Sequence, residues 1–298
     1  MTRLPTELQA AIYPEVVPFY DEDTNTFSYV VYKQGDPRCA VIDSVLDLDY
    51  PSGTISTGGA DRIIDYIQKH QLTVEWILET HVHADHLSAA PLIKEKLGGK
   101  LAIGENIKTV QETFGKVFNE GTEFKRDGSQ FDRLLGDGDM LELGDLVIHA
   151  VHTPGHTPAC MTFIIGDAVF VGDTIFMPDG GTARVDFPGG DARTLYQSIH
   201  RILELPEQFR MFMCHDYCPN GRALEYQTTV GAQRKNNIHV NDKVSEHDFV
   251  TMREARDATL GMPRLILPSL QVNMRAGHMP PSDDSGRVFL KVPVNAFV

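Results

Sequence analysis

The chain has 298 residues, of which 42% are hydrophobic and 23% charged, an ordinary balance for a globular protein. Its formal net charge is −14, and its lysines and arginines form no cluster along the sequence. This excludes binding to nucleic acid through a basic surface, although two or three local arginines still suffice to hold a small anion. The sequence contains no run of 18 apolar residues, so it predicts no membrane-spanning helix.

The N-terminal sequence, MTRLPTELQAAIYPEV, contains no apolar segment of the kind found in secretory signals, so we expect a cytoplasmic protein. In that compartment cysteines stay reduced, and we expect buried free thiols at Cys39, Cys160, Cys214 and Cys218. Cys214 and Cys218 flank His215, but the chain has no second cysteine pair with which to complete a zinc knuckle.

In the first half of the chain, short apolar runs alternate with amphipathic segments. The apolar runs predict strands at Phe27–Tyr32, at Cys39–Ser44 and in VEWILE, at residues 74–79. The amphipathic segments predict helices at Gly58–His70, Leu87–Gly99 and Asn106–Phe118.

The second half continues with strands and Gly-Asp turns. The segment MTFIIGDAVFVGD predicts two strands joined by such a turn, Asp191–Leu205 predicts a helix, and FRMFMC predicts a further strand. The last 75 residues hold one more predicted helix, SEHDFVTMREARDATLG, and a proline-rich tail. We expect one domain over residues 1–298, with a core at about 10–220 and a C-terminal extension at about 221–298.

A dense group of metal-type ligands follows the predicted strand VEWILE. Three histidines and an aspartate lie within six residues: His81, His83, Asp85 and His86. A single histidine usually has a structural role, but this density indicates metal binding. Imidazole and carboxylate ligands without cysteine suit zinc, iron or manganese.

Three later strand ends carry further residues of this kind. They are His156 in HTPGH, Asp173 in VGDT and His215 in CHD. Each is a weak signal alone, and a Gly-Asp pair usually marks only a turn. Functional sites in layered α/β folds gather at strand ends, so we expect the four loops to converge on one pocket.

The motifs THVHADH, TPGHT, GDT and CHD, in this order over Glu79–Asp216, resemble the metallo-β-lactamase superfamily. The resemblance implies an αββα sandwich with a metal site along one edge. It implies one metal on His81, His83 and His156 and a second on Asp85, His86 and His215, with Asp173 bridging them.

Three later segments, GGTARVDFPGGDARTLYQSI, CHDY and NMRAG, are similar to persulfide dioxygenases, which are relatives of glyoxalase II. This resemblance covers almost the whole chain. The segment DLDYPSGTIST, between Leu46 and Gly58, and a longer tail depart from the pattern and are typical of a bacterial branch.

The dioxygenase resemblance implies one Fe(II), held by His81, His156 and Asp173, with positions left open for substrate sulfur and O₂. The residues around it would then orient the ligands and bound water; these are His83, Asp85, His86 and His215. The implied reaction oxidises glutathione persulfide with O₂ to sulfite and glutathione.

Three alternatives remain open because the sequence does not count metals. They are a glyoxalase II-like hydrolase of glutathione thioesters with two zinc or iron ions, a zinc-dependent lactonase, and a non-catalytic metal-binding scaffold. Candidate residues for a glutathione-like anion are Arg184, Tyr217, Arg222, Asn273 and Arg275. We expect no nucleic-acid or membrane partner, and a homodimer on general grounds.

Overall fold

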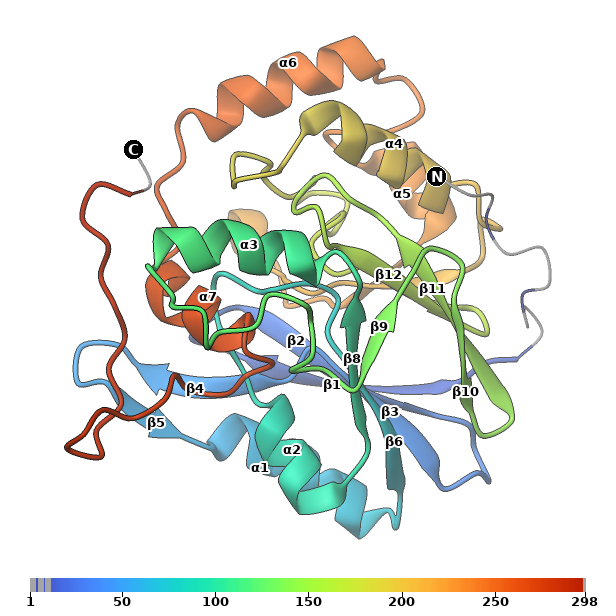
Figure 1. Ribbon diagram of the computed structural model, residues 1–298. Coiled ribbons are helices and arrows are strands. Elements are labelled where there is room, and N and C mark those ends of the chain that lie inside the picture. Colours follow the sequence, from blue (N-terminus) through green and yellow to red (C-terminus); the bar gives the residue numbers. More distant parts are fainter. Residues whose placement is uncertain (1–3, 5–7, 9–11, 297–298) are drawn as a thin grey trace.

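The computed structural model describes Leu4, Leu8 and residues 12–296 of the chain. Two six-stranded β-sheets pack face to face, and helices cover the outer face of each sheet (Figure 1). The predicted αββα sandwich is therefore confirmed. Most of the N-terminal segment in which no secretory signal is predicted lies outside the described residues.

The first sheet has the strand order β1-β2-β3-β6-β8-β9. Its strands are β1 (Glu15–Asp21), β2 (Thr26–Tyr32), β3 (Arg38–Ile42), β6 (Thr73–Leu78), β8 (Lys100–Gly104) and β9 (Arg133–Leu135). The first three strands are antiparallel, whereas β3, β6, β8 and β9 run parallel. The carboxyl ends of these parallel strands therefore lie along the same edge of the sheet.

The second sheet has the order β10-β11-β12-β13-β14-β15. Its strands are β10 (Met140–Leu143), β11 (Leu146–His152), β12 (Met161–Ile165), β13 (Ala168–Phe170), β14 (Arg210–Phe212) and β15 (Gln227–Thr229). In this sheet only β13 and β14 pair in parallel, and the segment that connects them contains α4 (Ala192–Ile202). The predicted turn between β12 and β13 is present at Gly166, whose φ is +59°.

A third, three-stranded sheet has the order β5-β4-β7, with β4 at Val45–Asp49, β5 at Thr54–Ser56 and β7 at Leu87–Ser88. The segment DLDYPSGTIST thus forms most of the β4–β5 hairpin. Because Leu87 and Ser88 pair with β4, the helix predicted from Leu87 begins later, as α2 (Ala90–Leu97).

The other helices are α1 (Gly58–Lys69), α3 (Ile107–Val117), α5 (Val230–Asn236), α6 (Glu246–Asp257) and α7 (Ile266–Asn273), with a 3₁₀ turn at Pro219–Gly221. The C-terminal extension therefore holds three α-helices where one was predicted. Short, polar α5 has no apolar period, and α7 carries Pro268 within its first turn, where proline is tolerated. Among the described residues, no helix combines the length and the apolar character needed to cross a membrane.

Apolar side chains form one layer between the sheets and one outside each sheet. Aromatic residues fill the middle layer, including Phe163, Phe170 and Phe212. The helices of the extension join both outer layers, because Leu270 of α7 packs with α1–α3 and Phe249 of α6 packs with α4. Helices α6 and α7 of the extension are thus part of the packed structure.

The amphipathic pattern of α4 is confirmed, since Leu195, Ile199 and Ile202 are buried against the second sheet. We expect Ile199→Ala to lower the free energy of unfolding by about 2–5 kcal/mol, because it removes buried methylene groups and leaves a cavity. Urea unfolding followed by circular dichroism measures this loss. Gln197→Ala, on the exposed face of the same helix, should change stability by less than about 0.5 kcal/mol, and an equal loss in both variants would contradict the assigned packing.

Candidate metal centre

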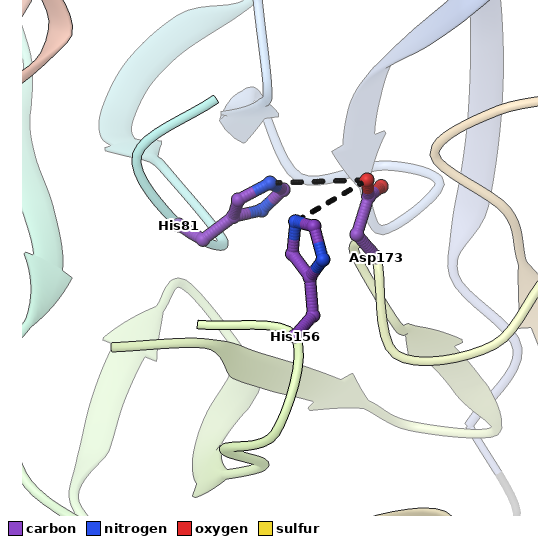
Figure 2. A group of neighbouring side chains, drawn as sticks. All are labelled: His81, His156 and Asp173. Atoms are coloured by element: carbon purple, nitrogen blue, oxygen red, sulfur yellow. Dashed lines mark ion pairs between the residues drawn. The ribbon is translucent and has the colours of Figure 1, made fainter. Parts of the chain in front are cut away.

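Ligand-type residues come together from four loops, each of which follows a strand. His81 follows β6, His156 lies between β11 and β12, Asp173 follows β13, and His215 follows β14. Figure 2 shows the side chains of His81, His156 and Asp173 converging from separate segments of the chain. Residues up to 134 positions apart in sequence, His81 and His215, thus share one site.

His81, His156 and Asp173 form a triangle of ligand atoms. Nε2 of His81 lies 4.0 Å from Oδ2 of Asp173, and Nε2 of His156 lies 3.7 Å from the same oxygen. These distances are too long for hydrogen bonds. They suit a shared cation, since metal–ligand bonds of roughly 2.0–2.2 Å bring such atoms around one ion.

The opposite ring nitrogens of both histidines are held by the protein. Nδ1 of His156 donates to the carbonyl oxygen of Arg184 at 2.7 Å, and Nδ1 of His81 lies 3.0 Å from Oγ1 of Thr80. The Thr80 hydroxyl donates to Asp43, so its oxygen accepts from His81. Each Nε2 therefore carries a lone pair that faces the site.

The charge state of this triangle also suits a metal. Burial holds the pKa of His81 well below its ordinary value, so its imidazole is neutral. Burial alone would raise the pKa of Asp173, but His215, His81 and His156 hold it well below its ordinary value. Two imidazoles and one carboxylate are a ligand set that proteins use for divalent metals, non-haem iron among them.

A second group lies beside the triangle: His83, Asp85, His86 and His215. Nε2 of His83 donates to Oδ1 of Asp43, Nδ1 of His86 donates to the carbonyl oxygen of Leu87, and Nδ1 of His215 donates to that of Asn25. Among the described residues, Nδ1 of His83 and Nε2 of His86 are buried and have no hydrogen-bond partner.

His215 connects the second group to the triangle. Its Nε2 lies 3.1 Å from Oδ2 of Asp85 and 3.2 Å from Oδ1 of Asp173. Buried polar atoms in native proteins almost always have partners, so the unpaired ring nitrogens of His83 and His86, close to these carboxylates, favour a cation-binding site. The residues therefore fit one metal on the triangle and offer donors for a second.

Two carboxylates that the sequence analysis did not single out support the ligand loop. Asp43 accepts from the amide of Thr80 at 2.7 Å and from His83 at 3.1 Å, and Oε2 of Glu79 lies 3.4 Å from Nε2 of His83. Both are buried, and burial raises the pKa of Glu79. Asp43 and Glu79 directly follow β3 and β6, so the strand-end rule applied to the histidines also points to them.

Two glycines let the ligand loops approach closely. Gly172, with φ +50°, lies against Thr80, and a Cβ there would come within 2.6 Å of the Thr80 hydroxyl. Gly155, with φ +141°, lies against the backbone of Leu195, where a Cβ would be 2.3 Å away. The glycines of VGDT and TPGH thus allow the backbone positions that bring Asp173 and His156 together.

A cavity of about 410 Å³ opens onto the triangle. His81, His156, Asp173 and Asp85 line it, whereas His83, His86 and His215 are fully buried and do not. The C-terminal extension forms another wall with Arg253, Arg256, Leu260 and Arg264. A metal on the triangle is therefore directly accessible from the cavity.

Of the predicted substrate-binding residues, Arg184 and Tyr217 line this cavity. The Arg184 guanidinium is already engaged, with both Nε and Nη2 2.6 Å from Asp186 and Nη1 donating to the carbonyl oxygen of Gly261. The ring of Tyr217 stacks on His215 and is 57% exposed, which leaves it accessible to a ligand.

The other three predicted residues do not line the cavity. Arg222 forms ion pairs with Asp179 and Asp216, which connect two loops near the site. Arg275 pairs with Glu120 at 2.6 Å, and Asn273 is buried behind the ligand loop. The structure therefore gives these three residues intramolecular partners.

Arg256 and Arg264 were not singled out from the sequence. Both line the cavity and are exposed, and within the described part of the chain neither guanidinium forms a hydrogen bond or an ion pair. They are therefore available to bind an anionic ligand. Their position at the cavity results from the packing of α6 and the following segment over the sandwich, and no local sequence motif predicts this packing.

Comparisons with known proteins agree with this fold and site. Residues 21–215 match the metallo-β-lactamase superfamily, and the chain belongs to this family. A probable metallo-hydrolase of Burkholderia pseudomallei is 56% identical over 93% of this chain and 98% of its own. Glyoxylase B2 of Dictyostelium discoideum is 47% identical over 95% of this chain and 96% of its own.

More distant relatives include the mitochondrial persulfide dioxygenase ETHE1 of mouse, which is 27% identical over 88% of this chain and 89% of its own. Among solved structures, ETHE1 from Myxococcus xanthus superposes with a TM-score of 0.70 and 26% sequence identity, covering 89% of this chain and 100% of that one. The family and the donor set together define a metal-binding enzyme of the superfamily.

Replacing a residue that only hydrogen-bonds to a metal ligand typically lowers metal affinity by roughly 10–100-fold. We expect a larger loss of metal affinity in Asp173→Asn, because this change removes the carboxylate of the triangle itself. Metal content after anaerobic loading with Fe(II) and desalting measures this. Asp49→Asn, in the β4–β5 hairpin, is the control. Full retention of iron in Asp173→Asn would show that the triangle is not the primary site.

Proposed function

We propose that this chain is an Fe(II)-dependent persulfide dioxygenase that oxidises glutathione persulfide with O₂ to sulfite and glutathione. One observation carries the proposal: His81, His156 and Asp173 line the cavity, whereas His83, His86 and His215 do not. A single metal on the triangle would thus have its open positions toward the substrate, while the buried histidines orient its surroundings.

The similarity to ETHE1 supports this proposal, because it extends over most of both chains in sequence and in structure. The ligand set supports it as well. Two histidines and one carboxylate on one face, with the other face open, are typical of Fe(II) oxygenases, whereas hydrolytic zinc sites of this kind use two ions about 3.5–4 Å apart.

The proposed reaction balances as a four-electron oxidation. A persulfide R–S–SH, O₂ and water give the thiol R–SH, sulfite and two protons. The S–S bond breaks, the terminal sulfur loses four electrons, and O₂ accepts them. When bound, Fe(II) supplies coordination positions for sulfur and O₂ and the redox chemistry that activates O₂.

The residues of the cavity provide the binding part of the function. The guanidinium groups of Arg256 and Arg264 are free to pair with the carboxylates of a glutathione moiety. The apolar side chains of Phe176 and Phe187 line the same cavity and limit water beside the reacting sulfur. The Thr80 hydroxyl and the Arg184 carbonyl hold Nδ1 of His81 and of His156, so that Nε2 of each ring is directed at the metal position.

A second candidate function is hydrolysis of a glutathione thioester by two metal ions. The ring nitrogens of His83, His86 and His215, with Asp85 beside them, offer the donors for a second ion. The 47% identity to Glyoxylase B2 also favours this alternative. The proposed cytoplasmic location and homodimer rest on the sequence arguments alone.

Oxygen uptake distinguishes the two functions. We expect the protein, purified anaerobically and loaded with one equivalent of Fe(II), to consume O₂ and produce sulfite in a 1:1 ratio when glutathione persulfide is added. S-Lactoylglutathione is offered in parallel to the iron-loaded and zinc-loaded protein. Thioester hydrolysis without oxygen uptake would contradict the dioxygenase proposal and support a binuclear hydrolase. Neither activity would favour a binding scaffold.

The two free arginines give a further test. We expect Arg256→Ala and Arg264→Ala each to raise KM for glutathione persulfide by about tenfold, the effect of losing roughly 1.4 kcal/mol of charge-assisted binding, with kcat little changed. Steady-state oxygen uptake measures both constants. Arg133→Ala, an exposed arginine on β9, is the control, and an unchanged KM in both cavity variants would remove them from the substrate site.

A further inference from the structure

Asn273 ends α7, in the C-terminal extension, and its side chain reaches the loop that carries His83, Asp85 and His86. The residue is 5% exposed. Its Nδ2 donates to the carbonyl oxygens of His83 at 2.9 Å and His86 at 2.8 Å, and its Oδ1 accepts from the amide of Ser88 at 2.8 Å. One carboxamide therefore binds the loop at three points.

These contacts use the full donor capacity of the Asn273 amide. Its two N–H groups donate to two carbonyls on either side of Asp85, and its oxygen accepts from the amide of Ser88, the last residue of β7. An aspartate would accept from Ser88 but would face two carbonyl oxygens without a proton to donate. The geometry at this position therefore calls for asparagine.

The residues around Asn273 keep α7 against the loop. Gly277, with φ +84°, packs so closely that a Cβ would lie 2.6 Å from Pro91 and 3.0 Å from the carbonyl oxygen of Ser88. The hydroxyl of Ser88 donates to Glu79, whose other oxygen lies 3.4 Å from His83. A continuous set of contacts thus connects α7 to the ring of His83.

We propose that Asn273 is a positioning residue, through which the C-terminal extension sets the geometry of the loop bearing His83, Asp85 and His86. It touches neither the cavity nor the triangle of His81, His156 and Asp173, so it acts through the backbone of the loop. The role holds for one metal or two, because the loop either orients the first metal's surroundings or supplies the second metal's donors.

Gln271 provides a matched control on the same helix. It is also a buried amide with three backbone hydrogen bonds, but these go to Leu267 and to the N–H and carbonyl of Lys291 in the tail. Replacing it costs a similar number of contacts without touching the ligand loop. Gln271→Ala thus measures the general cost of losing a buried amide from α7.

The experiment compares Asn273→Ala, Asn273→Asp and Gln271→Ala by two readouts that need no turnover. Amide hydrogen exchange is followed in the metal-free protein, and Fe(II) affinity is measured anaerobically by competition with a chelator. We expect faster exchange at residues 83–88 and an Fe(II) affinity lower by about 10–100-fold in Asn273→Ala, with both unchanged in Gln271→Ala.

Asn273→Asp keeps the oxygen that accepts from Ser88 but removes the N–H donors to His83 and His86, so it tests the donors alone. It also provides a second test if Asn273→Ala fails to fold. It should retain protection of the Ser88 amide but lose Fe(II) affinity, because only the donors to His83 and His86 are lost. Unchanged Fe(II) affinity in Asn273→Asp, or equal losses in the Asn273 and Gln271 variants, would overturn the proposal. Neither result depends on whether the enzyme is a dioxygenase.

Discussion

The orientation of five buried histidine rings is the constraint on which the site depends. Each ring has one nitrogen held by a protein group, and this contact turns the other nitrogen toward the site; the five are His81, His83, His86, His156 and His215. Without a cation, this concentration of buried polar atoms is unfavourable. The surrounding fold supplies acceptors at defined positions, and the binding energy of a metal offsets the cost.

The acceptors come from every part of the sandwich. Asp43 follows β3, the carbonyl of Arg184 lies in the loop before α4, and that of Asn25 lies in the β1–β2 turn. The site is therefore a property of the assembled layers and not of the HVHADH loop alone. The C-terminal extension takes part in the same way, by covering the cavity with arginines and by holding the ligand loop from behind.

The layered fold and the metal-ligand candidates could be predicted from the sequence because their signals are local. Apolar periodicity marked α1 and α4, and ligand density marked His81 to His86. Asp43 carried the same strand-end signal but had no neighbouring histidine motif, and Glu79 lay within the predicted strand VEWILE, which concealed its position at the strand end. α5 and α7 were missed because neither shows an apolar period, and tertiary packing stabilises them.

The substrate-binding residues were harder to predict from the sequence than the metal ligands. Arg222 and Arg275 are arginines near recognisable motifs, yet carboxylates of the chain already neutralise them. Arg256 and Arg264 lie in no recognisable motif, yet they line the cavity and form no ion pair with a described residue. Sequence gives the residue type, but only the packed structure shows whether a charge already has an internal partner.

The hydrogen bond from Asn273 to His83 joins positions that are 190 residues apart. On the ribosome, the ligand loop emerges long before the helix that holds it, and contacts of such separation close only late. The nascent chain therefore carries an exposed cluster of histidines for most of its synthesis. An ion that binds before α7 docks meets a ligand loop without the contacts of Asn273, so full affinity for the metal develops only after the last helix has packed.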